Sequence, residues 1–385
     1  MEPGEMTKNL SRIILTSLTI FFISQVPLFA THAQDTNSYQ NIISNPVLEN
    51  QPIDLLLFLS PQYGHDTEIH TAINAYFAAV KNDLHWTCQI IQIEQENNNY
   101  EYIDYLTETY HQKDDIKACL MVGEDLNTPL AGDCNYMEQP SSVPWSTTNS
   151  YETSDQGIIC KPYTVDICIS LLYPTHELSY ETKKADLISA FTKFSTQRHP
   201  LITNPIQVLE SSDLNTYSKQ LYQQISTYGT LTYIEDATEQ DISTSSADPY
   251  TAFFVHGHSS PAGTDVNAQQ KIGWFTADTL DDLNTPLFGA DGCYAGGWWS
   301  NQQDNNLLDS SIDATCYGSK IFTNTNLQVM ALGLLSQNGF STPVSFIENV
   351  FPELLQGKTL AEAMIGDTCT GDTIIVGDPT FHFTI

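Results

Sequence analysis

Two short apolar runs, each ending at a glycine-containing turn, most constrain what this chain can fold into. Residues 250–255 (YTAFFV) are followed by His256-Gly-His-Ser, and residues 286–290 (PLFGA) are followed by Asp291-Gly-Cys-Tyr. Both runs are short, β-prone and bounded by turn residues, so they predict two buried strands of a parallel sheet. Residues just past the carboxyl ends of such strands line the active-site crevice. We therefore expect a histidine and a cysteine at one edge of a sheet.

The spacing of these blocks favours a thiol–imidazole pair. The separation of 35 positions between His258 and Cys293 is enough for one crossover connection, so the two strands can be neighbours. A thiolate is a nucleophile, and an imidazole can hold its proton and pass it to a leaving amine. Gly292 lets the backbone approach a substrate and can direct an N–H group at an oxyanion. His256 is the alternative histidine, because it shares a face with His258 in an extended segment.

The order of strand, Gly-His block, linker, strand and Cys resembles the clan of caspases, legumain, clostripain and separase. Within that clan, it is most similar to the gingipain-type cysteine peptidases. Residues 371–381, which read GDTIIVGDPTF, are similar to that family's closing strand. The resemblance spans roughly residues 50–385. It implies an α/β fold with two successive subdomains, each a doubly wound, mostly parallel sheet flanked by helices, and a cysteine endopeptidase that cleaves polypeptides through an acyl-enzyme.

The resemblance also suggests further site residues. The family places a carboxylate at a strand end to orient the histidine, and Glu210 follows a predicted strand at 205–209, with Asp213 as the alternative. Asp291 either lines the substrate groove or caps the next helix. Trp298 and Trp299 either wall the groove or pack in the core.

The chain departs from the family at several positions. Ser259 stands where the family usually has Gly, and Ser170-Leu171 stand where it usually has Gly-Arg. Leu221 falls near the position of the acid expected from Arg-specific members, so Arg specificity is not expected. Residues 34–50 are too short for the pro-domain of such zymogens.

Three other functions stay open from the sequence. A transpeptidase of the same family would resolve the acyl-enzyme with an amine instead of water. A zinc enzyme could use His256, His258 and Cys293, with Asp265 or Asp291 as a further ligand. A peptidase-like binding protein could keep the fold without the activity.

The charge balance excludes some partners. The formal net charge is −32, from 14 Lys and Arg against 46 Asp and Glu. Nucleic acid is therefore not an expected partner, since phosphate binding needs basic patches. The chemistry needs no cofactor and no catalytic metal, while the carboxylates could supply a structural calcium site.

The first 33 residues have the pattern of a secretory signal peptide. Lys8 and Arg12 precede an apolar stretch at 13–30, and Thr31-His-Ala supplies small residues for cleavage. We expect a secreted protein, extracellular or periplasmic, with no stable membrane insertion after cleavage. Because secretion permits disulfides, Cys134 and Cys160 are the first pair to consider among the eight cysteines.

Apolar periodicity gives the expected organisation after the signal peptide. It predicts a flexible arm at 34–50, an N-terminal α/β subdomain at 51–160 and a catalytic α/β subdomain at 161–385. Cys88, Cys119 and Cys168 fall in predicted strands and are expected to be buried. Further strands are expected at 53–59, 86–93, 118–122, 165–172, 230–234 and 320–322, and helices after Asp66 and at 102–110, 182–195, 215–228, 345–355 and 359–364.

Overall fold

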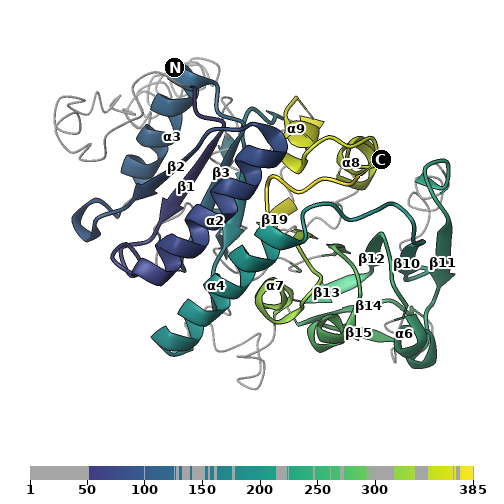
Figure 1. Cartoon of the computed structure of the whole chain (residues 1–385). Coiled ribbons are helices and arrows are strands. Elements are labelled where there is room, and N and C mark those ends of the chain that lie inside the picture. The colour runs from purple at the N-terminus through teal and green to yellow at the C-terminus, as the bar shows by residue number, and fades with distance from the viewer. Residues whose placement is uncertain are drawn as a thin grey trace, which may run out of the picture. The chain divides into compact units, whose positions relative to one another are not determined.

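One sheet of ten strands runs through the structure, with helices packed against it (Figure 1). The strand order is β11-β10-β12-β16-β17-β19-β9-β3-β1-β2, and all neighbours are parallel except β17 and β19. The predicted α/β class with a mostly parallel sheet is therefore confirmed. The strands are β1 (Leu55–Leu59), β2 (Cys88–Gln92), β3 (Ala118–Val122), β9 (Cys168–Leu172), β10 (Ile206–Glu210), β11 (Leu231–Glu235), β12 (Ala252–His256), β16 (Leu287–Asp291), β17 (Val329–Gly333) and β19 (Thr373–Gly377).

The computed structural model describes residues 52–98, 100–124, 126, 130–131, 139–140, 152–154, 157–159, 163–175, 178–213, 223, 225–245, 248–260, 262–268, 273–292, 295, 316–333, 346–366, 368–369 and 373–384. The predicted signal peptide and arm lie outside these ranges, as does most of the predicted helix at 215–228. Of the residues singled out above, Cys134, Cys160, Leu221, Cys293, Trp298 and Trp299 also lie outside them.

The helices and minor strands fill the connections between the strands of the large sheet. The helices are α2 (Thr67–Leu84), α3 (Tyr100–Asp114), α4 (Tyr180–Thr196), α6 (Glu239–Ser245), α7 (Lys320–Thr323), α8 (Phe351–Leu354) and α9 (Leu360–Met364). Short 3-10 turns are η1 (Gln95–Asn97), η3 (Ala277–Asp282) and η4 (Tyr317–Ser319), and η5 (Phe346–Val350) is a π-helix. The minor strands are β4 (Leu130–Ala131), β5 (Gln139–Pro140), β6 (Glu152–Ser154), β7 (Gly157–Ile159), β8 (Tyr163–Thr164), β13 (His258–Ser260), β14 (Gly263–Asp265), β15 (Trp274–Thr276) and β18 (Thr368–Cys369).

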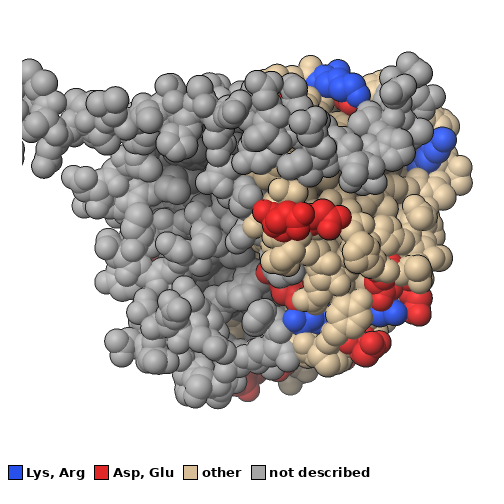
Figure 2. Space-filling view, turned by 90° about the vertical axis from the view of Figure 1, so that its left-hand side faces the viewer, with Lys and Arg blue, Asp and Glu red and all other residues tan. Residues whose placement is uncertain are grey.

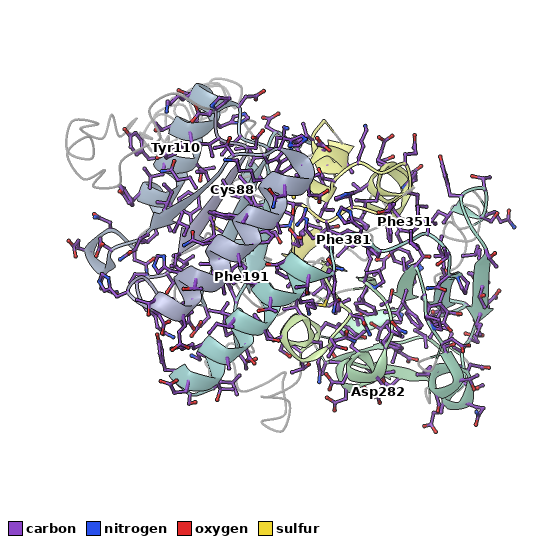
Figure 3. All side chains as sticks on the ribbon, viewed as in Figure 1. Cys88, Tyr110, Phe191, Asp282, Phe351 and Phe381 are labelled. Atoms are coloured by element: carbon purple, nitrogen blue, oxygen red, sulfur yellow. The ribbon has the colours of Figure 1, made fainter. Side chains whose placement is uncertain are left out.

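Local sequence explains the start of α2 and its contact with α4. Asp66 caps α2 by accepting hydrogen bonds from the backbone N–H groups of Glu68 and Ile69. Tyr76 on the apolar side of α2 lies 5.7 Å, centroid to centroid, from Phe191 of α4, which Figure 3 labels. Both rings are fully buried, and burial of a ring like Phe191 is worth roughly 1.5–3 kcal/mol. The chain passes from β1 to β2 and then back past β1 to β3, so right-handed crossovers put α2 and α3 on opposite faces of the sheet.

The sheet continues across the long segment between its two halves. After that segment, β9 pairs with β3, with Ala118 opposite Cys168. On its other side β9 is next to β19, which lies antiparallel to β17. The predicted subdomain boundary at residue 160 therefore lies between strands of one continuous sheet and stays a prediction.

The Gly-Asp-Pro turn that follows β19 anchors the C-terminal segment. The Asp378 carboxylate is buried and accepts hydrogen bonds from the Tyr76 hydroxyl at 2.6 Å and from Arg198 Nη1 at 3.5 Å. Gly377 has φ +111°, and a Cβ there would lie 2.1 Å from the Gln328 carbonyl oxygen. The turn therefore requires glycine, and the aspartate joins the chain end to α2 and to the residues after α4.

The structure corrects the sequence prediction between the Cys block and the closing strand. The predicted strand at 320–322 is wrong, because Lys320–Thr323 form the short helix α7. Lys320 Nζ there contacts Asp278 and Asp281 at 2.9 and 2.6 Å. The strand next to β16 is instead Val329–Gly333, which is buried throughout. An apolar run as short as Ile321-Phe322 cannot distinguish helix from strand by its periodicity.

The two faces of the sheet around β12 are covered by different elements. Phe253 lies 5.3 Å, centroid to centroid, from Phe275 of β15. Phe254 points to the other face, where its ring lies 5.1 Å from that of Phe351 on α8, labelled in Figure 3. Since side chains alternate along a strand, His256 points to the same face as Phe254.

Acidic side chains on the described part of the face in Figure 2 form small separate groups with basic side chains among them. No helix in the described ranges is long and apolar enough to cross a membrane.

Candidate active site

Three polar side chains lie side by side where β10, β12 and β16 end. The register of these parallel strands places Glu210 next to His256 and His256 next to Asp291. Register partners in parallel strands point to the same face, so the three side chains form a row. All three are buried, with His256 5% exposed. The apolar residues before them build the strands, and the strand ends bring them together.

His256 bridges the two carboxylates of this row. Its Nδ1 atom lies 2.8 Å from Glu210 Oε1, and its Nε2 atom lies 3.5 Å from Asp291 Oδ2. The Tyr233 hydroxyl of β11 donates a hydrogen bond to Glu210 Oε2. Neither carboxylate oxygen of Asp291 accepts a hydrogen bond from the part of the chain that the structure describes.

Burial and charge shift the pKa values in the row. Burial lowers the pKa of His256, but the neighbouring Asp291 charge and the Glu210 hydrogen bond outweigh it and raise that pKa above its ordinary value. Burial raises the pKa of Asp291 to about 6, because few groups compensate its charge. Burial, followed by the hydrogen bond to Glu210, raises the pKa of Tyr233. Glu210 and His256 thus form a hydrogen-bonded pair inside the protein, and this contact favours the protonated imidazole.

His258 lies in a different environment from His256. It begins β13, and its side chain is 67% exposed. Its Nε2 atom lies 3.3 Å from Oδ2 of Asp213, whose side chain is 44% exposed, and the Ser211 hydroxyl donates to Asp213 Oδ1 at 2.7 Å. The structure therefore pairs Glu210 with His256 and Asp213 with His258.

Glycines bring the ends of β12 and β16 into contact. The Gly257 N–H donates to the Asp291 carbonyl at 3.0 Å. A Cβ on Gly292 would lie 2.1 Å from Ser259 Oγ and 2.3 Å from the Gly257 carbonyl oxygen. A Cβ on Gly257 would lie 1.8 Å from the Asp265 carbonyl oxygen. No other residue type fits at either turn without backbone movement, so the histidine block and Gly292 are in direct contact.

The other predicted site residues stand as follows. Asp291 is buried against His256. Asp265 accepts a hydrogen bond from the Asn267 N–H at 3.1 Å. Cys293, Trp298 and Trp299 lie outside the described residues. His256, His258, Asp265 and Asp291 do not form a cluster of metal-ligand atoms; in the described ranges such a cluster occurs at Asp83, His199 and His382.

Sequence reasoning missed two features of this region. Tyr233 gave no signal beyond its place in a strand, and its contact with Glu210 depends on the pairing of β10 with β11. The role of Asp291 beside His256 could have been found by aligning the ends of the two strands. That alignment depends on the register of the two strands, which cannot be read from the sequence alone.

The described cysteines are unsuited to nucleophilic chemistry. Among the cysteines whose side chains the structure describes, Cys119 and Cys168 are fully buried and Cys88 and Cys316 are half-buried, and these four are free thiols. Burial raises the pKa of each of them, for Cys88 to about 12. The expectation of buried cysteines is confirmed for Cys119 and Cys168, and Cys88 is less enclosed than expected.

Comparison with known proteins places the fold in one class, that of the gingipain cysteine proteinases. The crystal structure of the Arg-specific cysteine proteinase gingipain R (RgpB) matches with a TM-score of 0.58 and 12% sequence identity, over 88% of this chain and 80% of that chain. The complex of Porphyromonas gingivalis RgpB pro- and mature domains matches with a TM-score of 0.59 and 12% identity, over 86% of this chain and 79% of that chain. No family model and no curated protein sequence matches this chain. The likeness at this identity is one of fold.

Proposed function

We propose that this protein is a cysteine endopeptidase that cleaves polypeptides, with Cys293 as the nucleophile and His258 as the proton carrier. The contact between Gly292 and the Gly257–Ser259 segment carries this proposal. His256 pairs with Asp291 in the register, and His258 and Cys293 each follow two residues later in the sequence. The two segments leave neighbouring strands and meet at this glycine contact. They are therefore well suited to bring the Cys293 thiol to the His258 imidazole.

The surroundings of the two histidines favour His258. Both ring nitrogens of His256 face carboxylates, and the ring is buried. A proton carrier must reach the substrate, and one of its ring nitrogens must be available to accept the thiol proton. His258 is exposed, and among the described residues a carboxylate faces one of its nitrogens. We therefore assign proton transfer to His258, orientation of its ring to Asp213, and support of the strand ends to Glu210 and His256.

The proposed reaction follows from these roles. The Cys293 thiolate attacks the carbonyl carbon of the scissile peptide, and the Gly292 N–H stabilises the oxyanion that forms. The His258 imidazolium gives its proton to the leaving amine, which yields a thioester and a free amino terminus. Water then attacks the thioester while His258 accepts a proton from it, and this step releases the acid and restores the Cys293 thiolate and the His258 imidazolium.

Selective alkylation of the protein with iodoacetamide, followed by mass spectrometry across a pH series, tests this function. The raised pKa values of Cys88, Cys119, Cys168 and Cys316 keep those thiols slow. We expect Cys293 to label at least about 10-fold faster than they do near neutral pH, because an imidazolium partner stabilises its thiolate. His258→Ala should remove this advantage, whereas His65→Ala, at an exposed histidine outside the site, should keep it.

Labelling of Cys293 no faster than that of Cys88 would show that the nucleophile assignment is wrong. If labelling is fast but independent of His258, the proton carrier is another group. A peptide library supplied to the active protein, with Cys293→Ala as the blank, then identifies the residue at the cleavage point. Products joined to an added amine in place of water would assign transpeptidation.

Secretion is part of the proposed function. The pattern of residues 1–33 supports export with cleavage near Gln34. Sequencing the amino terminus of the protein recovered from the culture medium or periplasm tests it. A chain that remains cell-associated and begins at Met1 would contradict it.

A further inference from the structure

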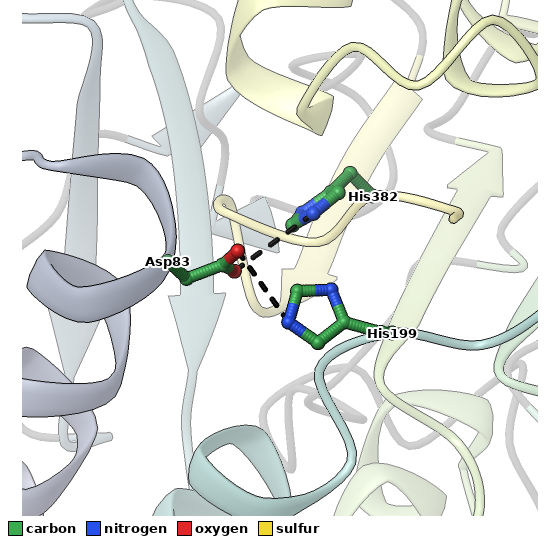
Figure 4. Close-up of side chains that lie close together, drawn as sticks. All are labelled: Asp83, His199 and His382. Atoms are coloured by element: carbon green, nitrogen blue, oxygen red, sulfur yellow. Dashed lines mark ion pairs between the residues drawn. The ribbon is translucent and has the colours of Figure 1, made fainter. Parts of the chain in front are cut away.

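We propose that Asp83, His199 and His382 bind one divalent transition-metal ion of the zinc class. The three residues come from segments far apart in the sequence and converge on one point (Figure 4). Asp83 lies in the last turn of α2, His199 lies just past the end of α4, and His382 lies in the C-terminal segment after β19. Imidazole and carboxylate groups form a ligand set that suits Zn²⁺.

The ligand atoms are close to the spacing that a bound ion needs. Asp83 Oδ1 lies 3.4 Å from His199 Nε2, and Asp83 Oδ2 lies 3.8 Å from His382 Nε2. Ligands at about 2.0–2.1 Å from a tetrahedral zinc ion are separated by about 3.3 Å. All three ligand atoms lie within 4.8 Å of one another. Small movements of the exposed His199 ring would complete the geometry.

Neighbouring groups hold the ligands in position for metal binding. The Thr380 carbonyl lies 3.3 Å from His382 Nδ1, and a proton on Nδ1 that is donated to it leaves the Nε2 lone pair directed at the cluster. Arg198 Nε donates to Asp83 Oδ2 at 2.7 Å, which fixes the carboxylate and leaves Oδ1 toward His199. The Arg198 guanidinium is itself held by Asp378.

The Asp83 carboxylate is approached by both imidazole rings as well as by a permanently charged group. Asp83 already has a cationic partner in Arg198. His199 and His382 each place a ring nitrogen near the same carboxylate. Their rings are near-perpendicular, at 80° with centroids 5.2 Å apart.

The site is open to solvent on one side. Asp83, Arg198 and His199 line a cavity of about 760 Å³, and the His199 side chain is 50% exposed. A metal ion can enter from this cavity and keep water as its remaining ligand. The same cavity is lined by Tyr250 and Pro286, which precede β12 and β16. The cavity thus lies at the amino ends of these strands, opposite His258. The metal ion would therefore join the C-terminal segment to α2 and to the residues after α4, and it would take no part in peptide cleavage.

Zinc binding to a tag-free protein with Cys293→Ala as the background tests the proposal. That background removes the proposed thiolate as a competing zinc ligand. Isothermal titration with Zn²⁺ is expected to give one equivalent per chain, and Co²⁺ in its place should give the intense visible absorption of a tetrahedral site. His199→Ala is expected to weaken zinc binding by at least about 100-fold, since even residues that only orient metal ligands cost 10–100-fold. His65→Ala should have no effect.

Two further measurements keep the test decisive. His382→Gln keeps a polar side chain at the buried position, and its circular dichroism without metal shows whether it folds. At a zinc concentration of about 100 times Kd, the folding equilibrium of the parent should shift by about 100-fold, and that of folded His199→Ala should not. Unchanged zinc stoichiometry and affinity in His199→Ala and His382→Gln would overturn the proposal, as would absence of binding to the parent protein.

Discussion

The Nδ1 atom of His256 lies 2.8 Å from Oε1 of Glu210, a residue 46 positions earlier in the chain. Both side chains are buried, and they come from adjacent parallel strands. An ion pair inside a protein requires compensation for its lost hydration, and the Tyr233 hydroxyl supplies a further hydrogen bond to Glu210. The ends of β10 and β12 thus contain a buried carboxylate–imidazole pair that links the two strands.

Removal of the Glu210 charge should destabilise the fold. Glu210→Gln leaves His256 buried without its anionic partner, which typically costs about 3–5 kcal/mol. Because the pKa of His256 is raised in the folded state, the contribution of its protonated form is complete below the ordinary histidine pKa of about 6.5 and disappears as pH rises through the raised value. Urea unfolding should therefore show a larger loss at low pH than at high pH. Glu96→Gln, at an exposed glutamate, should change stability by less than about 0.5 kcal/mol.

Asp291 should make stability fall as pH rises through its titration. Burial raises its pKa from 3.8 to about 6, so the folded protein binds a proton that the unfolded chain has lost. The favourable contribution of the protonated acid is present below about pH 4 and is lost as pH rises to about 6, with a total of roughly 3 kcal/mol. The unfolding free energy of the wild type minus that of Asp291→Asn should therefore decrease as pH rises through this window. A constant difference would show that Asp291 is ionised throughout.

The glycine contact should be intolerant of a single methyl group. In Gly292→Ala, the added Cβ would lie 2.1 Å from Ser259 Oγ and 2.3 Å from the Gly257 carbonyl oxygen. Overpacking of this kind costs typically 1–3 kcal/mol, and a displacement of about 1 Å at the site can reduce turnover 100-fold. Gly229→Ala is the matched control, because its Cβ would make an ordinary contact at 3.7 Å with Ile206. Thermal unfolding and alkylation of Cys293 measure both effects, and equal behaviour of the two variants would contradict the contact.

Asp213 should act through the orientation of His258. Asp213→Asn removes the carboxylate that lies 3.3 Å from His258 Nε2, and we expect Cys293 alkylation to slow about 10-fold near neutral pH. The rate should recover at alkaline pH, where the thiolate forms without help from the imidazolium. Asp248→Asn, at an exposed position, is the control. A rate loss that persists at alkaline pH would indicate a structural defect in place of an orienting role.

Local sequence patterns determined most of the sheet and the general place of the site. The runs before His256 and Asp291 are short, apolar and bounded by turns, and both form buried strands of a parallel sheet. The Asp66 cap and the apolar stripe of α2 could also be predicted from the sequence, and both are present in the structure. Such features depend on residues within a few positions of one another, which is the range that propensity and periodicity cover. The strand predicted at 320–322 was wrong because a run of three residues fits either period.

The tertiary structure decided which groups meet. The sequence offered Glu210 and Asp213 as partners for His258, with His256 as the alternative; the fold gives Glu210 to His256 and Asp213 to His258. The Asp83, His199 and His382 cluster had no sequence signature, since its members are separated by more than a hundred residues. Strand register and helix packing are set by the sum of many long-range contacts. Only the folded chain therefore determines which carboxylate faces which imidazole.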